Sequence, residues 1–203
     1  MEKLRSLEDI CRLMRLDYEQ YIKTTNFSWY RGRSYEEIPF KKIFVAGSAF
    51  DFSKTNDLAQ LIYSTGKADE IGAELAKYDN SAIITGATPP DTSIPHQVVV
   101  SYKETGGKGP VMGIIGGYED IDEVPFLDQL KEYYDILIHY DASGIPGADS
   151  FGNRLLYRDL PNVGMSDGII TIMGGAGTLD ESSKAYHMGK PIGILSITCT
   201  TRL

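Results

Sequence analysis

The chain has 203 residues, of which 42% are apolar and 24% are charged, and its formal net charge is −8 at pH 7. These values are typical of one soluble globular domain of ordinary size. The acidic balance argues against a nucleic-acid partner, which needs a basic surface, and the lack of an apolar run of about 18 residues argues against a membrane span.

Few side chains in the sequence point to a metal or redox centre. Cys11 and Cys199 have no metal-binding or redox spacing, and the N-terminus lacks the apolar core of a signal peptide. We therefore expect reduced thiols in a cytoplasmic protein. His96, His139 and His187 are dispersed and show no metal-ligand spacing. The sequence predicts no metal and no other cofactor.

Residues 1–37 are predicted to form an N-terminal helical extension. Apolar side chains recur there with the period of an amphipathic helix, at Leu4, Leu7, Cys11, Met14 and Tyr18. This helix would either pack against its own domain or contribute to a dimer interface. Residues 38–203 are predicted to form a single nucleotide-binding domain.

Short apolar runs alternate with helical segments from residue 41 onward. Strands are predicted at 43–46, 82–84, 111–115, 133–138, 168–173 and 191–197, and helices at 56–78, at 91–104, around 153–159 and after Gly177. This alternation predicts an α/β fold with a doubly wound, mostly parallel, Rossmann-like sheet. The chain stops soon after the sixth predicted strand without a predicted closing helix, so we expect a truncated C-terminus.

Three loops follow predicted strands, at the sheet edge where ligands bind in such folds. They are Gly47-Ser48, Thr85-Gly86 and Gly174-Gly175-Ala176-Gly177-Thr178. The last is a glycine-rich turn between a strand and a helix, where exposed backbone N–H groups and the helix dipole favour a phosphate. We expect the three loops to converge on one nucleotide site.

Glu181, just beyond the glycine-rich turn, has two interpretations. From Thr178 to Glu181 the sequence has the T-x-x-E spacing of a capping box, in which the glutamate bonds back to the cap residue. Three glycines in four positions exceed what a cap needs, however. That excess favours a carboxylate placed beside a bound nucleotide.

Arg154 and Arg158 form a second candidate cluster. They are four residues apart, so on a helix they share one face. Either that face is solvated, or the guanidinium groups clamp a phosphate or a ribose.

Other familiar motifs are excluded by their context. Gly175-Ala176-Gly177 lacks the third glycine of a dinucleotide-binding fingerprint, and no Gly-Lys pair continues as a P-loop. The segment from Gly164 to Gly168 has the G-x-S-x-G pattern of a serine hydrolase. It precedes a predicted strand, whereas a nucleophile elbow follows one.

The remaining candidates resemble a known family. Arg158 on a helix, Asp167 before a strand, and the run from Gly174 to Glu181 are similar to the cytokinin-activating nucleoside 5′-monophosphate phosphoribohydrolases. This is the LONELY GUY family, whose members were once mislabelled as lysine decarboxylases. Its pattern is an Arg on a helix, then a strand, then P-G-G-x-G-T-x-x-E; here Met173 replaces the proline.

The resemblance extends more weakly over residues 41–197. Where the family has a second glycine-rich loop, this chain has the segment from Thr85 to Pro90. That segment resembles the wider Rossmann-like group, which includes nucleotide sensors and proposed molybdenum-cofactor carriers.

The resemblance implies hydrolysis of the N-glycosidic bond of a nucleoside 5′-monophosphate, such as AMP or a cytokinin ribotide, to free base and ribose 5-phosphate. It implies that Arg158 and Glu181 are catalytic, with Arg158 holding Glu181 ionised. It also implies a homodimer or larger homo-oligomer. The implied nucleotide contacts are Gly47, Ser48, Gly86, Arg154 and the run from Gly174 to Thr178. The alternative is a non-catalytic nucleotide-binding protein, either a sensor or a cofactor carrier.

Overall fold

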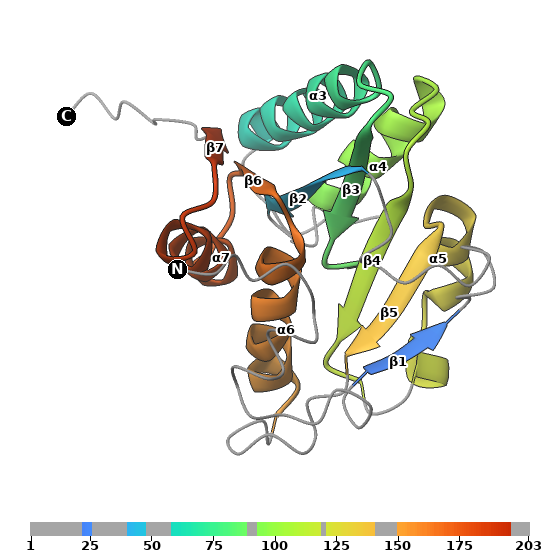
Figure 1. The fold of residues 1–203 in the computed structure, drawn as a ribbon, viewed down its shortest axis with the longest axis vertical. Helices are drawn as coiled ribbons and strands as arrows, with labels where there is room; N and C mark the ends of the chain where they lie inside the picture. The colour runs from blue at the N-terminus through green and yellow to red at the C-terminus, as the bar shows by residue number, and fades with distance from the viewer. Residues whose placement is uncertain are drawn as a thin grey trace.

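A seven-stranded sheet forms the centre of the molecule (Figure 1). The computed structural model describes residues 22–25, 40–47, 58–88, 93–118, 121–140 and 150–195. The strand order is β1-β5-β4-β3-β2-β6-β7. The strands are β1 (Ile22–Thr25), β2 (Lys41–Gly47), β3 (Ser81–Thr85), β4 (Val111–Gly116), β5 (Ile136–Tyr140), β6 (Gly168–Ile172) and β7 (Ile192–Leu195).

The strands from β2 to β7 pair in parallel, and β1 pairs antiparallel with β5. Every residue of β3, β4 and β5 is buried. Such continuous apolar strands are typical of parallel sheets whose two faces are both covered by helices. The predicted doubly wound α/β fold is confirmed, including all six predicted strands.

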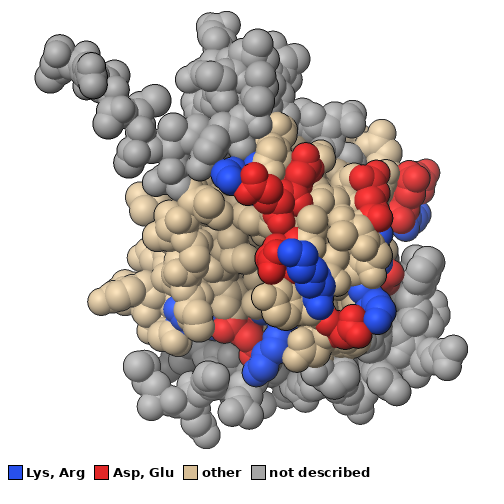
Figure 2. Space-filling view, turned by 90° about the horizontal axis from the view of Figure 1, so that it is seen from above, with Lys and Arg blue, Asp and Glu red and all other residues tan. Residues whose placement is uncertain are grey.

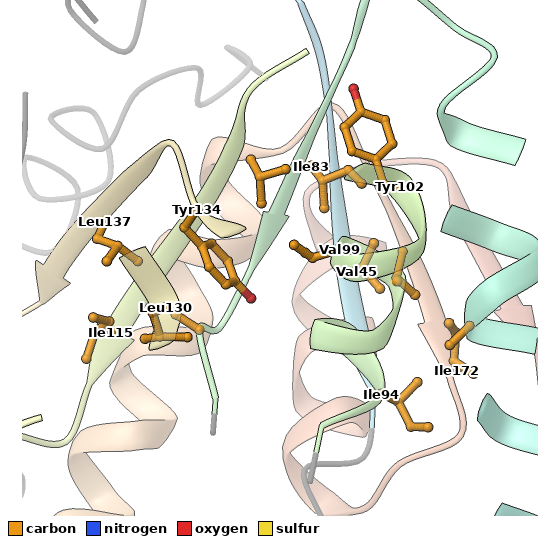
Figure 3. Packing of buried hydrophobic residues seen from close by; sticks show 14 of the residues in the cluster. Val45, Ile83, Ile94, Val99, Tyr102, Ile115, Leu130, Tyr134, Leu137 and Ile172 are labelled. Atoms are coloured by element: carbon orange, nitrogen blue, oxygen red, sulfur yellow. The ribbon is translucent and has the colours of Figure 1, made fainter. Parts of the chain in front are cut away.

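Helices cover the sheet on two sides and enclose two separate cores. They are α3 (Leu58–Leu75), α4 (Ile94–Glu104), α5 (Leu127–Tyr133), α6 (Phe151–Met165) and α7 (Ala176–His187), with a 3-10 turn at Ile121–Glu123. Val163 of α6 and Ala185 of α7 belong to one core. Residues of α3, α4 and α5 belong to the other, in which Val45, Ile83 and Val99 lie close together (Figure 3).

Helix α5, the 3-10 turn before it and strand β1 were not predicted. The segment 133–138 was expected to be a strand, but α5 ends at Tyr133 and β5 begins only at Ile136. Strand β1 falls within residues 1–37, where we expected a helical extension, and it joins the main sheet beside β5. The helix predicted over residues 4–18 lies outside the described residues, and the domain boundary at 37 stays a prediction.

Aspartates fix the register of neighbouring strands at the edge where the strands begin. The backbone N–H of Lys42 donates to Asp167 Oδ2 at 2.9 Å, which ties β2 to the start of β6. Asp135 Oδ2 accepts bonds from the N–H of Val111 at 2.8 Å and from Lys103 Nζ at 2.6 Å. Asp167 therefore has a structural role at the opposite edge from the predicted nucleotide loops.

Charged side chains of both signs lie intermixed on the face drawn in Figure 2. Among the described residues, Lys77 forms an ion pair with Glu74, and Lys108 forms one with Asp79. Within the described part of the chain, no helix is both long enough and apolar enough to cross a membrane.

Candidate functional site

The order of the strands places a switch point between β2 and β6. Strands β3, β4 and β5 follow one another on one side of β2, whereas β6 and β7 lie on its other side. Ligands of such sheets bind beyond the carboxyl ends of the strands at this reversal. Gly47 ends β2 there, and a Cβ on it would lie 2.9 Å from the carbonyl oxygen of Ile172. Only a glycine lets the two strands approach so closely.

The glycine-rich turn follows β6 directly. Met173 and Gly174 have φ angles of 53° and 123°, in the left-handed region that favours glycine. A Cβ on Gly174 would also overlap the side chain of Thr178, which folds back beneath the turn. Gly174, Gly175 and Ala176 are exposed. Since the first N–H groups of a helix have no partner within it, the start of α7 offers free donors to an anion.

The capping-box interpretation of Glu181 is wrong. Helix α7 begins at Ala176, and its N-cap is Gly175, which makes no side-chain capping bond. Thr178 is therefore already inside the first turn, and Glu181 lies in the second. The Thr178 side chain instead packs against Gly174, so it supports the turn rather than capping the helix.

Arg158 lies across the ends of β3 and β4, and its side chain is only 9% exposed. Its Nη1 donates to the carbonyl oxygen of Gly86 at 2.6 Å. A Cβ on Gly86 or on Gly116 would lie 2.9 Å from atoms of the arginine, so both glycines make room for it. The solvated alternative for Arg158 is therefore wrong.

The loop after β3 is shaped by Thr85. Its Oγ1 forms a hydrogen bond with the Tyr134 hydroxyl at 2.8 Å and accepts one from the N–H of Ala87 at 3.0 Å. Ala87 has a φ angle of 45°, so the chain turns sharply here. This turn holds Gly86 in place, with its carbonyl oxygen bonded to Arg158.

Two acidic side chains meet between α6 and α7. Asp159 is 4% exposed and Glu181 is 7% exposed, and the two carboxyl groups lie within hydrogen-bonding reach of each other. Oδ2 of Asp159 lies 4.0 Å from the place that a Cβ on Gly177 would occupy, so this acid reaches the glycine-rich turn. The pair thus connects the turn with the helix that carries Arg158.

Burial raises the pKa of both acids. It raises the pKa of Asp159 to about 6, against the lowering effects of Arg158 and Lys184. It also raises the pKa of Glu181 well above its ordinary value, and the Asp159 charge adds to that increase. Arg158 lowers both pKa values, but its effect is smaller than that of burial. The expectation that Arg158 holds Glu181 ionised is therefore wrong.

One further polar side chain is buried along the same helix. Asn162 lies one turn beyond Arg158 and is fully buried. Within the described part of the chain, neither polar atom of its amide has a hydrogen-bond partner, and the same holds for Nε of Arg158. Buried polar atoms without partners are uncommon and mark places where water or a ligand can bind.

The structure brings together most of the predicted site residues. Gly47, Gly86, Arg158, Glu181 and the turn from Gly174 to Thr178 all lie at the carboxyl ends of the strands or in the helices packed there. Ser48 lies outside the described residues. Arg154 lies in α6, on a part of the helix whose side chains are not described.

Sequence reasoning missed Asp159 and Gly116. Asp159 directly follows Arg158, and adjacent helical residues point in different directions, so its position did not indicate that it shares a site with Arg158. Gly116 could have been found as a glycine that ends a predicted strand, like Gly47. The described residues contain no group of three or more His, Cys, Asp or Glu side chains that could hold a metal ion.

The parallel sheet and the glycine-rich turn at its switch point define a Rossmann-like fold of the nucleotide-binding type. A family model confirms and narrows this class. The model of the SLOG cluster4 family matches residues 53–203, so the chain belongs to that family. The more specific resemblance to the LONELY GUY family stays a prediction. A search of curated proteins finds no match.

Solved structures with the same fold are distant in sequence. TM1055, known from an X-ray structure, is 22% identical, with a TM-score of 0.52 over 75% of this chain and 72% of that one. The molybdenum cofactor carrier protein of Chlamydomonas reinhardtii is 21% identical, with a TM-score of 0.52 over 76% of each chain. DNA processing protein A of Streptococcus pneumoniae is 16% identical, with a TM-score of 0.59 over 81% of this chain and 53% of that one. This chain thus spans about half of the last protein.

Proposed function

We propose that this protein binds a nucleoside 5′-monophosphate at the glycine-rich turn and hydrolyses its N-glycosidic bond. The observation that carries the proposal is a buried glutamate with a raised pKa, Glu181, one turn inside the helix that starts at that turn. An acid whose pKa is raised by burial beside a ligand-binding loop is typical of an enzyme site.

The exposed backbone from Gly174 to Ala176 would hold the 5′-phosphate. The N-terminus of α7 favours negative charge, and the absence of side chains at the glycines lets phosphate oxygens approach the N–H groups. Binding energy from the phosphate, which does not react, positions the ribose carbon that does.

Glu181 would then act as a general acid. The bond between C1′ and the base nitrogen breaks, its electron pair passes to the nitrogen, and the Glu181 carboxyl gives that nitrogen a proton. A water oxygen bonds to C1′, and its proton returns to the Glu181 carboxylate. The net reaction consumes one water and releases the base and ribose 5-phosphate. Arg158 would contact the sugar or the base from the ends of β3 and β4.

A non-catalytic binding protein is the second candidate. The observation that favours it is the hydrogen bond from Arg158 Nη1 to the Gly86 carbonyl oxygen at 2.6 Å. This bond leaves fewer guanidinium N–H groups for a substrate. Similarity in fold to a molybdenum cofactor carrier is compatible with this alternative. Such a protein would hold its ligand at the same turn without breaking a bond. In both cases the homo-oligomer and the cytoplasmic location stay predictions.

A nucleotide hydrolysis screen separates the two candidates. The protein is incubated with AMP, other nucleoside monophosphates and cytokinin ribotides, and released base is measured by chromatography. We expect base release that falls at least a hundredfold in Glu181→Gln, since general acids contribute about 10²–10⁴-fold. Asp180→Asn removes a charge from the neighbouring, half-exposed position and serves as the matched control.

The outcomes of the screen are distinct. Activity that survives in Glu181→Gln excludes the glutamate from the mechanism. Tight nucleotide binding without release of base, in the unaltered protein, identifies a sensor or carrier instead.

A further inference from the structure

The contact between Asp159 and Glu181 requires a proton. A carboxylate can only accept a hydrogen bond, so two ionised carboxylates cannot bond to each other. These two side chains come from different helices that pack together, are both more than nine-tenths buried, and lie within hydrogen-bonding reach of each other. A hydrogen bond between them requires that at least one keeps its proton.

The neighbouring cations have other partners. Three charged groups act on the pair: Arg158 on α6, and Asp180 and Lys184 on α7. Arg158 donates to the Gly86 carbonyl, and Lys184 forms an ion pair with Asp180. Within the described residues, neither cation forms a direct ion pair with Asp159 or Glu181. Two buried negative charges would thus have no directly paired cation, which is costly, and a retained proton removes one of them.

We expect the proton mainly on Glu181. Burial raises the pKa of both acids, and the next largest influence on Glu181 is the Asp159 charge, which raises its pKa further. The next largest influences on Asp159 are Arg158 and Lys184, which lower its pKa. Glu181 is therefore the acid expected to keep the proton and to donate to the Asp159 carboxylate.

We propose that Asp159 and Glu181 share a single proton at neutral pH, and that Asp159 is a positioning residue that keeps Glu181 protonated beside the glycine-rich turn. The pair then carries one negative charge instead of two, close to where a phosphate would bind. Its catalytic consequence rests on the proposed hydrolase function, but the pairing itself does not.

Titration of the free protein tests the pairing without any ligand. Side-chain carboxyl carbons are followed by carbon-13 NMR against pH in the unaltered protein, in Asp159→Asn and in Glu181→Gln. We expect Glu181 to titrate well above the ordinary glutamate range. We also expect its midpoint to fall by at least one pH unit in Asp159→Asn, because the neighbouring negative charge is removed.

Asp180→Asn is the matched control for this titration. It removes the same charge from the residue next to Glu181, but that charge is partly exposed and already paired with Lys184. We expect a much smaller change in the Glu181 midpoint. Ordinary midpoints for both Asp159 and Glu181 in the unaltered protein would overturn the inference, even if Asp159→Asn failed to fold. So would an unchanged Glu181 midpoint in a folded Asp159→Asn protein.

The pH dependence of AMP hydrolysis tests the consequence. If Asp159 keeps Glu181 protonated, Asp159→Asn shifts the alkaline limb of the kcat/KM profile, which reports the free enzyme, to lower pH by the same amount as the NMR midpoint, while KM at the pH optimum changes little. An unmoved limb in an active variant would show that Asp159 does not act through Glu181. If the protein releases no base but the carboxyl titrations are coupled, the hydrolase proposal fails and the shared proton stands.

Discussion

At the scale of single residues, Arg158 shows how glycines make room for a large buried side chain. Gly86 and Gly116 are both close to it, but they face different parts of the side chain. A Cβ on Gly86 would meet the guanidinium, whereas a Cβ on Gly116 would meet the arginine Cβ and Cδ. The far end of the side chain can move, and the part next to the backbone cannot.

Alanine substitutions should therefore have different effects at these two glycines. We expect Gly116→Ala to lower the free energy of unfolding by about 1–3 kcal/mol, the usual cost of overpacking. Gly86→Ala should cost less stability but should displace the guanidinium and reduce nucleotide binding. Gly66→Ala, at an open position in α3, is the control and should stabilise the helix by about 1 kcal/mol. Denaturant unfolding and AMP binding measure both quantities, and equal stability losses at Gly86 and Gly116 would contradict the packing argument.

Asp159 should make stability depend on pH. Its pKa is raised from 3.8 to about 6, so the folded state binds this proton more tightly than the unfolded state does. Stability from this group is then fully present below about pH 4 and is lost as the pH rises through about 6. The shift corresponds to about 3 kcal/mol. We expect Asp159→Asn to flatten the decline in unfolding free energy between pH 4 and 7, and a decline of unchanged slope would contradict the assignment.

At the scale of elements, the turn between β6 and α7 contains two glycines that differ in backbone conformation and in packing. Gly174 has a φ angle of 123° and contacts the Thr178 side chain, so the fold requires it. Gly175 has a φ angle of −109° and has nothing within 4 Å of its Cβ position. No packing contact among the described residues excludes a side chain at Gly175, which is the N-cap of α7, and its open backbone would give a ligand access to the start of the helix.

This difference predicts opposite results for two neighbouring variants. Gly174→Ala should lose about 1–3 kcal/mol of stability through backbone strain, in addition to the overlap with Thr178. Gly175→Ala should lose at most about 1 kcal/mol but should bind AMP clearly more weakly, because its Cβ obstructs the exposed N–H groups. Thermal unfolding and calorimetric titration with AMP give both values. Unchanged AMP affinity in Gly175→Ala would place the ligand elsewhere.

The sequence predicted the elements whose signals are local. The six parallel strands are apolar runs bounded by glycine or polar turns, and each could be identified without its neighbours. Helix α5 has only seven residues and only Leu130 buried, too little for a visible period. Strand β1 has four residues, and its position depends on pairing with β5, more than a hundred residues away. Glu181 was singled out from its position after the glycine-rich turn, whereas Asp159 comes close to it only through the packing of α6 on α7.

At the scale of the whole molecule, β1 forms the edge of the sheet next to β5. It pairs with β5 from Ile22 opposite Tyr140 to Thr25 opposite Leu137. Without β1, the backbone of β5 becomes an unpaired edge, which is both less stable and prone to pairing with other chains. Part of the segment assigned from the sequence to a helical extension thus belongs to the main sheet.

Deleting residues 1–37 should therefore impair the domain. We expect a melting temperature lower by on the order of 5–10 °C, from the loss of a few strand hydrogen bonds, and a tendency to associate. A chain that begins at residue 21 keeps β1 and is the control. Size-exclusion chromatography and thermal unfolding compare the two. If the chain that begins at residue 38 were equally stable and equally monodisperse, the pairing of β1 with β5 would contribute nothing to the stability of the fold.

The pairing of β2 with β6 has a consequence for how the protein folds. It joins Lys42 to Asp167, which are 125 residues apart in the chain, and the switch point exists only after this contact has formed. Closing so long a loop early is entropically unfavourable, so contacts of this range form late and slowly. The first half of the chain, folded alone or during synthesis, would have no binding site. A ligand at the switch point would therefore bind only the complete fold and stabilise it as a unit.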